Sequence, residues 1–243
     1  MTNAPFRPFE TEVDEGKALN LLEKACAGAE DGELFLERSK SEALVLDDGR
    51  VKTASFDTSQ GFGMRAVLGE VAGYAHSTEI SEAAMTRAVE TARLAVGAGG
   101  GTMAVGPKGT NTRLYEAIDP IESAGFSAKL DILKEIDAYA RALDPRVVQV
   151  TASVSATYQE VEILRVGGQR LTDVRPMTRL NVGVIVEQDG RRESGSAGGG
   201  GRVGLTGLLE PSNWQANARE ALRIALVNLE AVPAPAGQMD IVL

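Results

Sequence analysis

The stretch RRESGSAGGGGRVGL, residues 191–205, decides how the rest of the sequence is interpreted. It holds the consecutive glycines Gly198–Gly201, and a formal G-x-G-x-x-G pattern runs through Gly199, Gly201 and Gly204. The residues leave four interpretations open: a mobile loop, close packing against a neighbouring domain, contact with a peptide, or a nucleotide cradle. Glycine in an extended segment often marks a place where another backbone comes close.

The nucleotide cradle is the weakest of the four. A dinucleotide fingerprint needs its glycines to open a helix directly, so that helix amides meet the pyrophosphate. The residues before the run predict an antiparallel hairpin arm, and the next helix is expected only after Pro211. A Walker loop needs Gly-Lys followed by Ser or Thr, which Gly201-Arg202-Val203 does not provide.

The remaining sequence predicts one plan used twice. Apolar and polar residues alternate in extended segments, and each half of the chain closes with a helical pattern. Helices are expected after the capping residues Asp14, Ser81, Ser127 and Asn213. Tight turns between strands are predicted at Asp48-Gly49, Gly69-Glu70, Gly167-Gly168 and Asp189-Gly190. The fold class predicted is therefore α+β, with two related subdomains of antiparallel hairpin sheets, each covered by helices.

The same patterns predict the domain boundaries. Residues 1–13 read as a flexible arm, and residues 14–112 as an N-terminal subdomain that ends in a glycine-rich linker from residue 97. Residues 113–236 form the second subdomain, which contains the glycine-rich stretch. Residues 237–243 begin an apolar, strand-like run, which we expect to be the first strand of a further domain.

Charge and cysteine content exclude several classes of protein. The net charge of -9 argues against a nucleic acid or an anionic membrane as partner, because both need a basic face. No run of apolar residues is long enough to span a bilayer, and we do not expect the N-terminal residues to be a secretory signal, because they lack an apolar segment. A single cysteine excludes internal disulfides and fits a reducing cytoplasm.

Residues with catalytic chemistry do not converge. We interpret Cys26 as a buried helix residue and His76 as a strand-end or capping residue, because a zinc site, a Cys-His dyad or a Ser-His-Asp triad each needs a histidine in a defined relation to other groups. Asp47 and Asp48 suit a turn, while Glu160 and Glu162 are expected on a solvated strand face. Four arginines could bind a carboxylate terminus, although exposed ion pairs are the simpler expectation: Arg175, Arg179, Arg191 and Arg192.

Several stretches together resemble the N-terminal half of the TldD/PmbA proteins, closest to the TldD branch. They are DTSQGFGMRAVLGEVAGYAHSTEIS (57–81), VTASVSATY (150–158), DVRPMTRLNVGVIVEQDGRRESGSAGGGGR (173–202) and EALRIALVNLEAVPAPAGQMDIVL (220–243). The resemblance covers residues 14–243, and the glycine run preceded by Arg-Glu-Ser is its most specific part. It implies a cytoplasmic, zinc-dependent peptidase of unfolded or flexible peptides, built as a TldD-type/PmbA-type heterodimer.

The zinc motif of that family, His-Glu-x-x-x-His, belongs to the C-terminal half. Residues 1–243 contain no His-Glu pair and His76 does not match the motif, so no catalytic or metal residue is carried over. The resemblance implies that residues 237–243 lead into a missing catalytic domain, which would hold the zinc. This chain would shape the substrate chamber and supply dimer surface toward a PmbA-like paralogue or a second copy.

The candidate contacts for a peptide or a neighbouring domain come from the glycine-rich stretch: Arg192, Glu193, Ser194, Gly198, Gly199, Gly200, Gly201 and Arg202. The alternative function is a free-standing, non-enzymatic peptide- or protein-interaction module from a truncated or split gene. A nucleotide-binding enzyme that uses the glycine run is the other rival.

Overall fold

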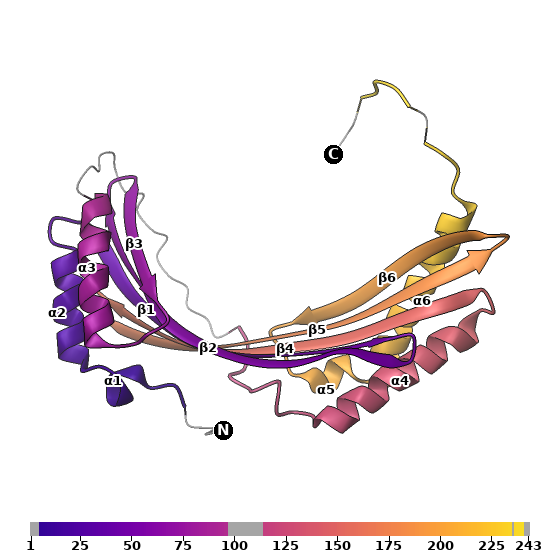
Figure 1. Cartoon of the computed structure of the whole chain (residues 1–243), viewed down its shortest axis with the longest axis horizontal. Coiled ribbons are helices and arrows are strands. Elements are labelled where there is room, and N and C mark those ends of the chain that lie inside the picture. The colour runs from indigo at the N-terminus through magenta and orange to yellow at the C-terminus, as the bar shows by residue number, and fades with distance from the viewer. Residues whose placement is uncertain (1–4, 97–113, 235, 241–243) are drawn as a thin grey trace.

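The computed structural model describes residues 5–96, 114–234 and 236–240, and Figure 1 shows their arrangement. Helices and strands follow in the order α1 (Pro8–Thr11), α2 (Glu15–Ala25), β1 (Asp31–Asp47), β2 (Arg50–Leu68), β3 (Val71–Ser77), α3 (Glu82–Val96), α4 (Phe126–Leu143), β4 (Val147–Arg165), β5 (Arg170–Gln188), β6 (Arg191–Gly201), α5 (Leu205–Leu208) and α6 (Pro211–Glu230).

All the strands of the described residues belong to one antiparallel sheet in the order β3-β2-β1-β4-β5-β6. At its centre β1 pairs with β4, from Glu33 opposite Arg165 to Asp47 opposite Thr151. Figure 1 shows the sheet strongly curved, with the helices on its outer side. The predicted α+β class with antiparallel hairpins and covering helices is confirmed, and the hairpins of both halves continue a single sheet.

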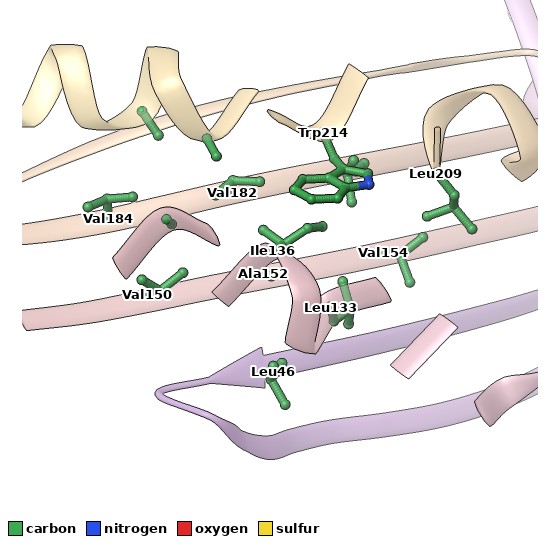
Figure 2. Packing of buried hydrophobic residues seen from close by; sticks show 14 of the residues in the cluster. Leu46, Leu133, Ile136, Val150, Ala152, Val154, Val182, Val184, Leu209 and Trp214 are labelled. Carbon is green, nitrogen blue, oxygen red and sulfur yellow. The ribbon is translucent and has the colours of Figure 1, made fainter. Parts of the chain in front are cut away.

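The described residues form two apolar clusters on the outer side, one at each end of the sheet. The first is formed by α2 and α3 against residues such as Leu34, Met64 and Leu164. The second is formed by α4 and α6 around Trp214, and Figure 2 shows its indole among valines of β4 and β5 and the side chains of Leu133 and Ile136. Each half of the chain therefore buries its helices separately on the shared sheet.

The backbone φ angles confirm two of the predicted turns between strands. Asp48 and Gly49 have φ of 51° and 72°, and Asp189 and Gly190 have φ of 54° and 81°. Both central residues of a type I′ turn need positive φ, which glycine and aspartate tolerate best. These turns fix the register of the β1–β2 and β5–β6 hairpins.

Two helix starts are confirmed, and the other two are wrong by two and by three residues. The Asp14 side chain accepts the Lys17 N–H at 2.9 Å, and Ser81 Oγ accepts the N–H of Ala84 at 3.1 Å. The helices expected after Ser127 and Asn213 begin instead at Phe126 and Pro211, after the backbone-only caps Gly125 and Glu210. Proline suits the first helical turn because its φ is preset and its missing N–H costs nothing there.

The segment expected to be a flexible arm is packed where it is described. Pro8–Thr11 forms α1, and Phe6, Phe9 and Val13 are buried in the first cluster. The predicted linker from residue 97 to 112 lies outside the described residues. In the strand expected at 237–243, residues 237–240 form no strand, and the last three residues lie outside the described part. The remaining predicted boundaries stay a prediction.

Charged side chains occupy the outer face between the two clusters. Arg38 Nη2 lies 2.7 Å from Glu160 Oε2, and Glu160 Oε1 accepts the Phe6 N–H at 2.9 Å. Arg170 pairs with Glu162 at 2.8 Å. The expectation of a solvated strand face is wrong, because Glu160 and Glu162 are only 7% and 3% exposed. Buried carboxylates need such partners, since desolvation alone would disfavour their charge.

A buried lysine holds the segment before α4 against the same face. Lys129 is 1% exposed, and its Nζ lies 2.5 Å from Glu42 Oε1 and 2.8 Å from the carbonyl oxygen of Ile121. A buried ammonium is stable only when such acceptors replace its lost water. The chain that leads from residue 114 to α4 is therefore anchored to β1.

α6 packs closely on β6 at Gly195. A Cβ there would overlap the Ala221 carbonyl oxygen and lie 2.5 Å from Ala225 N. We expect Gly195→Ala to lower the free energy of unfolding by about 1–3 kcal/mol, because the helix must move away from the strand.

Gly199 provides the matched control, since it lies on the same face of β6 and a Cβ there meets nothing within 4 Å. Gly199→Ala should change stability by less than about 0.5 kcal/mol in urea unfolding. Equal losses in the two variants would show that α6 does not pack as described.

Candidate peptide-contact site

The glycine-rich stretch is a strand, so the mobile-loop interpretation is wrong for residues 191–201. β6 pairs antiparallel with β5, from Arg191 opposite Gln188 to Gly201 opposite Thr178. Alternate residues face opposite sides of a sheet. Gly195 faces α6, so Arg192, Ser194, Gly198, Gly200 and Arg202 are at positions that face the inner side.

The close backbone approach that the glycines predict occurs inside the sheet. A Cβ at Gly198 would overlap the Leu180 carbonyl oxygen, and one at Gly200 would overlap the Thr178 carbonyl oxygen. Gly199 has open space instead. Glycine is therefore required at alternate positions because β6 lies against the β5 backbone there. Contact of these residues with a peptide stays a prediction.

The charged ends of β6 are engaged by neighbours. Arg192 Nε lies 2.5 Å from Glu187 Oε2, and Arg191 Nε lies 2.9 Å from Glu193 Oε1. These pairs are exposed, as expected, and such pairs contribute little to stability. At the other end, the Arg202 guanidinium lies 4.9 Å from the centre of the Tyr115 ring. Arg202 thus links β6 to the segment that follows residue 113.

A short helix follows the glycine run sooner than expected. α5 begins at Leu205, directly after Gly204, and not beyond Pro211. It spans four residues and Leu205 is fully buried. The run itself belongs to an antiparallel edge strand, whereas a dinucleotide fingerprint belongs to the first parallel strand of a βαβ unit. The geometry therefore does not match a phosphate-binding loop.

A surface of small hydroxyl side chains was missed by the sequence reasoning. β4 presents Thr151, Ser153, Ser155 and Thr157 at alternate positions. These side chains lie on the face of the sheet opposite to the apolar residues that face the helices. Neighbouring strands continue the surface on the inner side with Ser39, Ser41, Asn181, Ser194 and Ser196. The alternation in VTASVSATY was the available signal. The inner face can offer hydrogen bonds to an extended chain along much of the sheet.

The other candidate residues lie apart from one another. His76 is exposed on β3 and stacks on Tyr74, with ring centres 5.7 Å apart. Cys26 is 9% exposed at the end of α2. Within the described residues no group of three His, Cys, Asp or Glu side chains is placed to hold a metal ion. The described helices also include none that is long and apolar enough to cross a membrane.

Comparison with known proteins shows the family. The PmbA/TldA metallopeptidase domain 1 matches residues 32–96, and the PmbA/TldA metallopeptidase central domain matches residues 119–229. The chain belongs to the TldD/PmbA family. It is 40% identical over 219 residues to a metalloprotease TldD homolog of Haemophilus influenzae, covering 87% of this chain and 45% of that protein.

A second TldD homolog, from Buchnera aphidicola of Acyrthosiphon pisum, is 31% identical over 240 residues, covering 96% of this chain and 50% of that protein. The chain thus spans about half the length of the curated relatives that it matches. Family membership does not supply a metal site here, because the sequence holds one histidine and one cysteine. The zinc that the metalloprotease name implies is not fitted by these residues.

Solved structures share the fold of this TldD/PmbA chain. A Thermotoga maritima protein, named as a candidate modulator of a DNA gyrase, has a TM-score of 0.68 at 17% identity, covering 92% of this chain and 50% of that one. TldE from Thermococcus kodakarensis has a TM-score of 0.65 at 13% identity, covering 85% and 46%. Both therefore resemble it over about half their length.

The Cys26 thiol gives stability a dependence on alkaline pH. Burial raises its pKa from 9.0 to about 11, with a further rise from the negative charge of Asp31. The unfolded thiol ionises first, so its contribution is present below pH 9 and is lost as pH rises toward 11. We expect an extra loss on the order of 2 kcal/mol across that range compared with Cys26→Ala.

Urea unfolding of both proteins at closely spaced pH values measures this difference. The Cys26→Ala variant lacks the thiol but keeps every other group of the chain that titrates at alkaline pH. Identical pH slopes in the two proteins would contradict the burial of the thiol.

Proposed function

We propose that this chain is the N-terminal, non-catalytic portion of a TldD-like zinc metallopeptidase that acts on unfolded or flexible peptides in the cytoplasm. The observation that carries the proposal is the match of domain 1 and the central domain of a metallopeptidase family to a chain with one histidine and one cysteine. Zinc and the catalytic groups would then belong to the other half of the protein, as in the family motif.

The role of this portion would be to form part of the wall of the substrate chamber. The curved sheet leaves its inner face free of the helices, and that face carries rows of small hydroxyl groups. Such a surface can hydrogen-bond an extended backbone without a deep apolar pocket for one side chain. This supports selection for peptides that lack a fold of their own.

Dimer surface is the second proposed contribution, toward a PmbA-like or TldE-like paralogue or a second copy. Residues 50–60 of β2 are exposed along their length, and Val51 and Phe56 are 47% and 46% exposed. β3 pairs with β2 only from Phe62 onward, so the preceding edge has no strand beside it among the described residues. An exposed strand edge with apolar residues is a template for pairing with another chain.

The test compares two polypeptides with an unfolded casein in the presence of zinc. Residues 1–243 alone should neither bind zinc stoichiometrically nor cleave, whereas a polypeptide that continues from Leu243 through a His-Glu-x-x-x-His motif should cleave and lose activity with a chelator. Cleavage by residues 1–243 alone would refute the proposal. Analytical ultracentrifugation of the longer polypeptide measures its oligomeric state. If it is a monomer in the absence of a paralogue, the homodimer is excluded and the heterodimer is the remaining possibility.

The alternative is a free-standing interaction module, and the exposed edge of β2 is the observation in its favour. The gene discriminates between the two. A stop codon directly after codon 243, with no zinc motif encoded nearby, would favour the module.

A further inference from the structure

The edge of β5 that faces away from β4 is unpaired over the first part of the strand. β6 pairs with β5 only from Thr178 to Gln188, whereas β4 pairs with β5 as far as Arg170. In the described part of the chain, no strand lies beside the outer edge of β5 from Arg170 to Met177. A sheet edge of this kind is a template for one more strand.

A cavity of about 1000 Å³ lies along this edge. Its walls are the N-terminal arm at Pro5–Arg7 on one side and the segment Leu114–Ala117 on the other, and residues 170–175 of β5 form its base. Leu114 and Leu171 are 84% and 38% exposed in it. The volume is at the upper end of ordinary ligand pockets, roughly 300–1000 Å³. We call this cavity the β5-edge groove.

Both walls of the groove are fixed in place. The Glu160 carboxylate accepts the Phe6 N–H at 2.9 Å, which holds the arm. On the other side the Tyr115 hydroxyl donates to Asp173 Oδ2 at 2.8 Å, and Arg202 lies over the Tyr115 ring. A preformed site reduces the entropy that binding must overcome.

The direction of the backbone groups follows from the β5–β6 contact. The carbonyl oxygens of Thr178 and Leu180 point at β6, because a Cβ at Gly200 or Gly198 would overlap them. Backbone groups in a strand alternate in direction with a period of two residues. The carbonyls of Thr172, Val174 and Pro176 therefore point into the open edge.

Proline and valine on this edge agree with that direction. Pro176 has no N–H, and proline is accepted in a strand where its nitrogen faces away from the ladder. The Val174 N–H is bonded to the side chain of its neighbour Asp173. Thr172 thus offers an outward N–H and C=O group, Val174 offers its C=O group, and Pro176, which has no N–H, marks the end of the open ladder.

We propose that the β5-edge groove binds an extended peptide as an additional strand beside Arg170–Pro176. The inference rests on the proposed function and deepens it, since it assigns a docking site for the substrate within this chain. The occupant is an apolar, extended segment, because the groove exposes Leu114 and Leu171 while each of its arginines is paired with a carboxylate. The pairs are Arg7 with Glu10, Arg170 with Glu162, and Arg175 with Asp173. Neutral apolar stretches are what an unfolded polypeptide exposes.

The test uses residues 1–243, fluorescently labelled, and a bead library of random, end-capped octapeptides. Wild type should retain peptides rich in apolar residues. Thr172→Pro removes the outward N–H at a position that leaves the pairing with β4 intact, and it should weaken binding about tenfold, the size of one or two hydrogen bonds. Thr172→Val keeps the backbone donor and should bind within about threefold of wild type.

A second measurement does not depend on the folding of any variant. The retained peptides, resynthesised with N-methyl groups on alternate amides, should lose binding to the wild-type chain in one of the two alternations. Retention of no peptide, equal binding of the two Thr172 variants, or binding that N-methylation leaves unchanged would each overturn the proposal. A dimer that Thr172→Pro converts to monomer without peptide binding would assign the edge to a second copy and overturn it too.

Failure of this inference is separable from failure of the proposed function. Peptide binding is measured on residues 1–243 without catalysis, while cleavage is measured on the longer polypeptide. Cleavage without binding at the groove leaves the proposed function standing and removes the docking site.

Discussion

The antiparallel pairing of β1 with β4 is the constraint on which the rest of the structure depends. It joins Glu33–Asp47 to residues 151–165 and so turns the hairpins of both halves into one sheet. Because neither strand slips in this ladder, alternate residues keep one face along the whole length. That face carries both apolar clusters, and the opposite face carries the hydroxyl rows. The outer helices and the inner surface are therefore two results of a single register.

The charged band between the clusters explains how other segments attach to the sheet. Glu160 is opposite Arg38 across the central pair and also holds the arm through Phe6, while Glu42 holds the segment before α4 through Lys129. Each buried charge needs its partner, so these contacts specify position more than they add stability. The β5-edge groove lies between the two segments that the band fixes, which connects the internal electrostatics to the proposed docking of peptides.

Local features were predictable from sequence and long-range ones were not. Asp48-Gly49 and Asp189-Gly190 predicted their turns because few residues tolerate positive φ, and VTASVSATY predicted a strand because its period is two. The glycine run has no side-chain period, so its pairing with β5 could not be read from it. Burial of Glu162 depends on Arg170 across a turn, and the groove depends on where β6 stops pairing. The choice of β4 as partner of β1 joins residues more than a hundred positions apart, which no local pattern sets.

The central claim is that the shared sheet makes both ends of the molecule one folding unit, and two natural probes test it most directly. Trp214 lies in the second cluster and Cys26 in the first. Urea unfolding of residues 1–243, followed in one sample by Trp214 fluorescence and by labelling of the Cys26 thiol, should give coincident transitions. Two separate midpoints would show that the halves unfold independently and would contradict the account.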